Sequence, residues 1–429
     1  MALFSPKTWP FSVELLPDSA YLVGGSVRDR LLNRQPTYLD LDFVLARDAV
    51  QTAANIATTY NAGFVVLDKV RQIARVVFDN MTVDFAQQQG NSLEADLRRR
   101  DFTINAIAYH LPTQQIIDPL GGKADIQSQT IRMVSDKNLA ADPLRLLRGY
   151  RQAAQLGFAL SADTQTAIRQ LASALSTVSR ERVRSELDAL LSTSASSDYL
   201  SPMLEAQLLN FCLPHLNRDS IRQIKSIEQA IAQFQSAMPG YAKHLQSWAK
   251  PVPAGHYQSW VKAAKLSRLV CTTVCANASS DTYIDAKQAV AELTELKYSR
   301  SEIQVIETLI EAQRHIDALK QNQLARAQQF FLFKQTGSAF PAISLLALAQ
   351  GIPLATLKPL IKRFLNPNDD IARAPVLITG NTLIKEFQIQ PGPQIGQILK
   401  AVEQAQAEGR IRDRESAIAF VRLKLTNSN

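Results

Sequence analysis

The chain has 429 residues, of which 46% are hydrophobic and 20% charged, with 16 glycines and 19 prolines. This composition excludes an intrinsically disordered protein, a collagen and a disulfide-rich scaffold, and the length predicts more than one domain. The formal net charge of +8 favours an anionic partner such as a nucleic acid or a membrane surface.

The positive charge is unevenly distributed. Residues 1–135 contain 13 Lys/Arg and 14 Asp/Glu, a net charge of −1, whereas residues 136–429 contain 34 and 25, a net charge of +9. We therefore expect the C-terminal two-thirds to attract a polyanion. The sparse cysteines, the apolar N-terminus interrupted by prolines and the lack of about 20 consecutive apolar residues favour a soluble cytoplasmic protein with no membrane span. We interpret Cys271 and Cys275 as buried thiols rather than a metal site.

Short β-rich runs and helical segments alternate through the first 135 residues. Strands are predicted over Tyr21–Val23, Leu39–Leu45, Phe64–Leu67, Ala74–Phe78 and Met81–Ala86. Helices are predicted over Val27–Asn33, Asp48–Tyr60 and Phe102–Ala108. After about Pro143 the apolar spacing becomes helical, with predicted helices that include Leu144–Leu156, Thr164–Leu175 and Arg180–Leu191. The fold class is therefore α+β: a small unit with a mixed sheet, followed by an all-helical remainder.

A glycine-rich turn follows the first predicted strand and opens a predicted helix, with the sequence Gly24-Gly25-Ser26-Val27-Arg28-Asp29. Paired glycines let backbone N–H groups approach a phosphate, the helix N-terminus adds partial positive charge, and Arg28 adds a full charge. The alternative interpretation is a plain strand-to-helix turn.

Three aspartates lie in strand-like runs. Asp40 and Asp42 are separated by one residue, so both carboxylates emerge on the same face of a strand. Two carboxylates so close favour a cation between them, and their hard oxygen atoms suit Mg²⁺. Asp84, in another strand-like run, is expected to reach the same pocket, where nucleotidyl transfer would need triphosphate and metal together. The alternative is that these acids are exposed strand residues.

The segment Arg98–Ala106 is the most specific string in the chain. It is predicted to be a cationic entry to a helix, in which Asp101 caps the helix and Asn105 lies four residues further along the same face. A run of three arginines is otherwise typical of a solvated surface.

Five motifs, in this order, resemble those of the class II tRNA nucleotidyltransferases, the family of CCA-adding enzymes and bacterial poly(A) polymerases within the DNA polymerase β-like superfamily. The motifs are Gly24–Asp29 with Asp40 and Asp42, Arg98–Ala106, Asp118–Gly122, Asp142–Arg148 and Arg180–Glu186. The turn at Pro391–Gly396 is similar to the tail element of the bacterial members. The resemblance implies a nucleotidyltransferase head over residues 1–135, a helical neck over 136–195, a helical body over 196–335 and a tRNA-binding tail over 336–429.

The resemblance also implies a reaction and its residues. The 3′-hydroxyl of tRNA would attack the α-phosphate of CTP, or also of ATP, and release pyrophosphate. Asp40 and Asp42 would hold two Mg²⁺ ions, and Asp84 would be the third carboxylate, near the attacking group. The nucleotide-binding set would comprise Gly24, Gly25, Ser26, Arg28 and Asp29 at the triphosphate, Arg100, Asp101 and Asn105 at the sugar and phosphates, and Asp142, Arg145 and Arg148 of the fourth motif.

The fourth motif is where the protein would select the base. The carboxylate of Asp142 can accept from the exocyclic amine of cytosine or adenine, while Arg145 donates to a ring acceptor, and uracil and guanine present the wrong groups. The alternative is that Asp142 is a helix N-cap, because Pro143 follows at the favoured first helical position.

Two departures from the family pattern bear on specificity. Ala141 replaces the usual glutamate before Asp142, so any positioning role of that glutamate is absent. Only Gln87–Ser92 separates the strand of Asp84 from the next segment, where complete CCA-adding relatives have a longer flexible loop. Such a short loop resembles that of CC-adding enzymes, which stop after two cytidines and leave the terminal adenosine to a separate A-adding enzyme.

The same motifs are compatible with three other functions. A full CCA-adding enzyme and a poly(A) polymerase would share the fold and the metals, and CTP use would argue against the poly(A) polymerase. A non-catalytic RNA-binding protein would be expected to have lost the acids, yet Asp40, Asp42 and Asp84 are all present.

Overall fold

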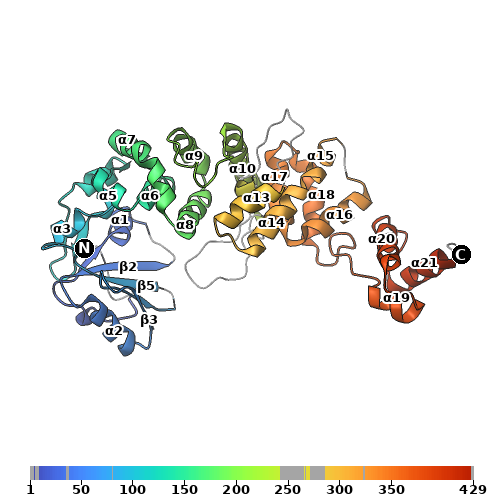
Figure 1. The fold of residues 1–429 in the computed structure, drawn as a ribbon, viewed down its shortest axis with the longest axis horizontal. Helices are drawn as coiled ribbons and strands as arrows, with labels where there is room; N and C mark the ends of the chain where they lie inside the picture. The colour runs from blue at the N-terminus through green and yellow to red at the C-terminus, as the bar shows by residue number, and fades with distance from the viewer. Residues whose placement is uncertain are drawn as a thin grey trace. The chain divides into compact units, whose positions relative to one another are not determined.

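The computed structural model describes residues 4, 9–34, 38–79, 81–241, 265, 267–270, 286–321 and 324–426 (Figure 1). They divide into two compact units. The first runs from the N-terminal residues to Ile221 and includes Glu295–Lys297, and the second takes the other described residues from Arg222 onward. This division into two units does not test the four predicted domain boundaries, so the head, neck, body and tail remain predictions. Cys271 and Cys275 lie outside the described residues, whereas Cys212 is buried and free.

The first unit contains a seven-stranded mixed sheet with the strand order β3-β4-β5-β2-β1-β6-β7. Its strands are β1 (Tyr21–Val23), β2 (Leu39–Leu45), β3 (Gly63–Asp68), β4 (Ile73–Val77), β5 (Met81–Gln87), β6 (Ala108–His110) and β7 (Gln115–Ile117). The central pair, β2 and β5, is parallel, and the other neighbours are antiparallel. The five strands predicted from sequence are all present, with ends that shift by at most one residue.

One face of the sheet is apolar and covered. Leu41 and Phe43 of β2 and Val83 and Phe85 of β5 are buried, and helix α2 (Ala49–Thr59) packs against β3, β4 and β5 (Figure 1). Because side chains alternate along a strand, the polar residues between these apolar ones all face the opposite side. Asp40, Asp42 and Asp84 are therefore on one face.

The other helices of this unit surround the sheet and continue into an all-helical segment. They are α1 (Gly25–Leu31), α3 (Leu93–Leu97), α4 (Gly122–Gln127), α5 (Asp136–Ala141), α6 (Leu144–Leu156), α7 (Ala162–Leu171), α8 (Arg180–Leu191) and α9 (Ser196–Glu205). The two-residue strands β8 (Thr130–Ile131) and β9 (Ala159–Leu160) pair in parallel, and 3₁₀ turns cover Val13–Leu15, Thr103–Asn105 and Ala172–Thr177. Helix α10 (Arg218–Ala237) begins in this unit and continues into the second.

The helix predicted over Phe102–Ala108 is wrong. The segment forms one 3₁₀ turn, Thr103–Asn105, and then enters strand β6 at Ala108. The Asn105 amide donates to the Asp101 carboxylate at 3.0 Å, so the polar side chains close a local turn instead of an α-helix. The apolar residues that follow are buried, and Ala108 pairs with both β1 and β7.

The second unit is helical in its described residues. Its helices are α13 (Ala286–Glu295), α14 (Arg300–Glu311), α15 (Gln313–Gln321), α16 (Arg326–Thr336), α17 (Phe340–Ala349), α18 (Leu354–Leu365), α19 (Gly380–Phe387), α20 (Pro393–Ala407) and α21 (Arg414–Thr426), with a 3₁₀ turn at Gly337–Ala339. Within the described residues, Arg326–Ala349 is the one stretch long and apolar enough to cross a membrane, but 67% of its most apolar window is buried inside the protein. Core helices of water-soluble proteins have the same length and burial, so this stretch is weak evidence for a membrane span.

Candidate active site

The backbone of the glycine turn lies close to the side chains of Asp42 and Arg100. Gly24 has φ = +77°, a backbone conformation that side chains disfavour, and it caps the N-terminus of α1. A Cβ atom on Gly24 would lie 3.3 Å from both Asp42 Oδ2 and Arg100 Nη1. A side chain at this position would strain the backbone and would also require Asp42 or Arg100 to move by a few tenths of an ångström.

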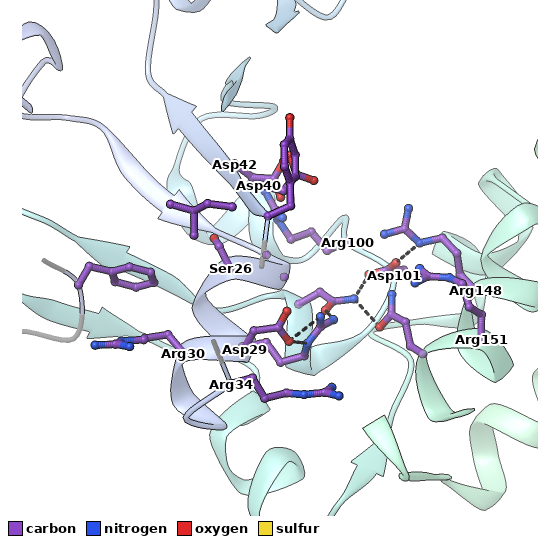
Figure 2. A pocket seen from close by; sticks show the side chains of 18 of the residues that line it. Ser26, Asp29, Arg30, Arg34, Asp40, Asp42, Arg100, Asp101, Arg148 and Arg151 are labelled. Carbon is purple, nitrogen blue, oxygen red and sulfur yellow. Dashed lines mark hydrogen bonds and ion pairs between the residues drawn. The ribbon is translucent and has the colours of Figure 1, made fainter. Parts of the chain in front are cut away.

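A cavity of about 640 Å³ lies beside this turn (Figure 2). It brings together eleven residues that the sequence predicted: Gly24, Gly25, Ser26, Arg28, Asp29, Asp40, Asp42, Arg100, Asp101, Asn105 and Arg148. The sequence reasoning missed other polar lining residues, namely Arg30, Arg34, Tyr38, Arg151 and Gln152. The helical spacing of Arg148, Arg151 and Gln152, at i, i+3 and i+4, was a signal that could have found the last two.

A polar network joins the cavity walls (Figure 2). The Arg28 guanidinium donates to Asp29 at 2.9 Å and to Oδ1 of Asn105 at 2.8 Å, and Nδ2 of Asn105 donates to the side chains of Asp101 and Gln152. Burial alone would raise the pKa of Asp101, but Arg148, the Asn105 amide and the backbone N–H of Phe102 together hold it below its usual value. Asp101 therefore stays ionised and orients Arg148, whose Nε lies 3.1 Å from Asp101 Oδ2.

Asp40 and Asp42 on β2 place two carboxylates close together, and the pKa of Asp42 is raised. Burial, followed by the nearby Asp40 carboxylate, raises the pKa of Asp42 from 3.8 to about 7. The Thr82 hydroxyl donates to Asp40 Oδ1 at 2.5 Å and fixes that carboxylate. Two adjacent carboxylates, one of them poorly solvated, fit a divalent cation that brings the missing positive charge and oxygen coordination.

Asp84 lies on the same sheet face but is otherwise engaged. It is directly opposite Asp42 in the register of β2 and β5, yet both of its oxygen atoms accept from Arg75, each at 2.7 Å. Accordingly, no group of three or more His, Cys, Asp or Glu side chains in the described ranges is arranged to hold a metal ion.

Asp142 and Arg145 line a second cavity of about 650 Å³, which shares Arg100, Asp101 and Arg148 with the first. Asp142 does not cap α6 through its side chain. Instead, Nη2 of Arg182 donates to both of its carboxylate oxygens, at 3.2 and 3.0 Å. Nη1 of Arg145 donates to the backbone carbonyls of Arg99 and Asn138, each at 3.0 Å.

These contacts show how both side chains of the fourth motif are held although Ala141 stands in place of the usual glutamate. Asn138 also donates through its amide to the carbonyls of Arg98 and Arg100, each at 2.8 Å, and so ties α5 to the arginine run. Neither Arg75 nor Asn138 was singled out from sequence, and Arg182 was noted only as part of the fifth motif. Side chains that meet across neighbouring strands or helices belong to different elements, so no periodic pattern in the sequence predicts the contact.

A glycine turn, a paired-aspartate strand and a basic polar wall around one cavity define the head of a nucleotidyltransferase. Comparisons with family models agree. Residues 20–132 match the "Poly A polymerase head domain", residues 157–220 the "Probable RNA and SrmB-binding site of polymerase A", and residues 261–421 a tRNA nucleotidyltransferase domain 2 model.

Individual relatives extend the match to nearly the whole chain. A CC-adding tRNA nucleotidyltransferase of Synechocystis is 42% identical over 96% of this chain and 95% of its own length. An A-adding tRNA nucleotidyltransferase of Deinococcus radiodurans is 30% identical over 94% of this chain and 95% of its own. The structure of the Thermotoga maritima CCA-adding enzyme complexed with tRNA shares the fold, with a TM-score of 0.65, 20% identity and coverage of 95% and 91%. The chain belongs to the tRNA nucleotidyltransferase and poly(A) polymerase family, and it is a nucleotidyltransferase.

Proposed function

We propose that this enzyme adds two cytidines to the 3′ end of tRNA, with CTP as the substrate and Mg²⁺ as the metal, in the cytoplasm. A separate A-adding enzyme would complete the CCA end. The observation that carries the proposal is the 42% identity with a CC-adding enzyme over 96% of the chain, compared with 30% for the A-adding relative.

The short loop supports the same specificity. Five residues join β5 to α3, and two hydrogen bonds hold them in place. The backbone N–H of Gln89 donates to Asp96 at 2.9 Å, and Ser92 caps α3 by accepting from the N–H of Ala95. Asp96 in turn pairs with Arg100 in the cavity wall, at 3.4 Å. A loop held in this way does not re-aim the base-reading residues after the second cytidine.

The cavity residues divide the work of binding the nucleotide. Gly24 and Gly25 would let backbone N–H groups approach the triphosphate, while Arg28 and Arg148 would neutralise it. Asp40 and Asp42 would hold the Mg²⁺, which when bound stabilises the charge on the entering and leaving oxygens of nucleotidyl transfer.

The second cavity would hold the base. Asp142, oriented by its two contacts with Arg182, would accept from the exocyclic amine of cytosine. Arg145 has one guanidinium nitrogen committed to backbone carbonyls, so its other N–H groups would donate to the ring acceptors of the base. Uracil would place a carbonyl against the Asp142 carboxylate and be rejected by repulsion between acceptors.

The test is to count the nucleotides added. The protein is incubated with Mg²⁺ and tRNA lacking its CCA end, with labelled CTP, labelled ATP or both, and products are resolved to single nucleotides. Two cytidines and no adenosine are expected. Adenosine added efficiently to tRNA ending in CC would show a full CCA-adding enzyme, and a long adenosine tail would show a poly(A) polymerase. Asp42→Ala serves as the inactive control, with its fold checked by circular dichroism.

A further inference from the structure

Three charged side chains form one row across three neighbouring strands. Asp42 on β2 is opposite Asp84 on β5, and Asp84 is opposite Arg75 on β4. Residues opposite one another in a sheet point to the same face, so all three side chains face the side on which the nucleotide is proposed to bind. Arg75 is thus the cation nearest in register to the third carboxylate.

The contact between Arg75 and Asp84 engages both oxygen atoms of the carboxylate. Nε of Arg75 lies 2.7 Å from Oδ1, and Nη2 lies 2.7 Å from Oδ2. The Asp84 side chain is 18% exposed and that of Arg75 is 37% exposed, so the pair is partly shielded from water. Parallel charge-assisted bonds of this kind are stronger and more directional than a single ion pair. The pKa of Arg75 is raised further above its usual value by its hydrogen bond to Asp84, so the guanidinium keeps its charge.

A carboxylate in this state is a poor metal ligand. The two bonds hold the carboxylate in one orientation, and a cation coordinated by its remaining lone pairs would lie close to the fixed positive charge of Arg75. In agreement with this, the described acids form no three-ligand group, although Asp84 is adjacent to Asp42 in the sheet.

We propose that Arg75 is a positioning residue that holds Asp84 away from the metal site in the free enzyme. The inference rests on the proposed function, because it takes Asp40 and Asp42 as the metal ligands. The free enzyme therefore offers a divalent cation only two carboxylates.

Manganese binding to the free protein tests this without any catalysis. Mn²⁺ is titrated into protein lacking RNA and nucleotide, and unbound Mn²⁺ is measured by electron paramagnetic resonance. Arg75→Gln frees Asp84, so its Mn²⁺ affinity should exceed that of the wild type by about tenfold. Arg47→Gln is the matched control, because it also removes one positive charge near the end of β2 but from a side chain that is 88% exposed. It should leave the affinity unchanged.

A double-mutant cycle separates release of Asp84 from a simple loss of repulsion. In an Asp84→Asn background, Arg75→Gln should no longer increase Mn²⁺ affinity, because there is no carboxylate to release. An equal increase in both backgrounds, or no increase in the Arg75→Gln protein, would overturn the proposal. The CTP-addition assay of the wild-type protein is a separate test. If Arg75→Gln binds Mn²⁺ more tightly but the wild type adds no cytidine, the proposed function is refuted and the role of Arg75 is not.

Discussion

Asp42→Asn should stabilise the metal-free protein while abolishing nucleotidyl transfer. In the folded state the Asp42 carboxyl is partly buried beside Asp40, and its pKa is raised from 3.8 to about 7. Between these two pH values the folded protein retains a proton that the unfolded chain has lost. The free energy of unfolding of the metal-free wild type therefore falls as pH rises through this window.

The magnitude follows from the shift. A rise from 3.8 to about 7 is about three pKa units, which corresponds to about 4 kcal/mol of destabilisation once the carboxylate is fully charged above pH 7. Below about pH 4 the carboxyl is protonated in both states and contributes no difference. The asparagine side chain of the variant is uncharged throughout, so the variant should exceed the wild type in stability by a margin that grows from pH 4 to pH 8.

Trp9 provides a local probe for this measurement. Its ring packs against Phe11 at 5.6 Å and against Phe43 of β2 at 5.8 Å between ring centroids. The chain has three tryptophans, so replacing Trp248 and Trp260 by Phe leaves fluorescence that reports on the sheet. Urea unfolding of both proteins in EDTA at pH 5 and pH 8 then gives the two differences in unfolding free energy.

Two results would contradict this prediction. One is an identical pH dependence of unfolding in the wild type and Asp42→Asn. The other concerns metal: added Mg²⁺ should stabilise the wild type at pH 8 and have little effect on the variant, because the variant lacks one of the two proposed ligands. Equal stabilisation of both proteins would show that the metal binds elsewhere.

Three further substitutions test the site and its support. Gly24→Ala should destabilise the protein by about 1–3 kcal/mol, because φ = +77° disfavours a side chain, and should raise KM for CTP; a wild-type melting temperature and KM would contradict this. Arg182→Gln should lower the ratio of kcat/KM for CTP to that for UTP by about tenfold, because Asp142 loses its orienting partner; an unchanged ratio would remove Arg182 from base selection. Gly122→Ala should lower the thermal midpoint sharply, since a Cβ there would lie 2.2 Å from the Thr103 carbonyl oxygen, whereas Gly396→Ala, with open space around it, is the control.

The periodic parts of the fold could be predicted from sequence. Helices α6 and α8 begin and end at the predicted residues, and so do strands β1 and β2. Their apolar residues alternate or recur every three to four positions, and burial of one face makes that pattern decisive. The spacing of Asp40 and Asp42 likewise predicted two carboxylates on one face, and the structure places both beside the glycine turn in one cavity.

Segments whose hydrophobic residues show no regular spacing were not predicted correctly from the sequence. Strands β6 and β7 have three residues each, too few to show alternation, and they are strands because β1 is available to pair with. The polar side chains of Asp101 and Asn105 bond to each other across a 3₁₀ turn, and this local closure overrides the helical spacing.

The parts of the candidate site could be found in the sequence because each consists of residues close together in the chain: a glycine turn, two adjacent carboxylates, an arginine run and the fourth motif. Which charged side chains contact one another depends on the tertiary structure. Arg75 reaches Asp84 because β4 and β5 pair in one register, and Arg182 reaches Asp142 across 40 residues because α8 packs on α6. Such partners depend on the packing of different elements against one another, so no local sequence pattern predicts them, and they fix the hydrogen bonds and orientation of each acid.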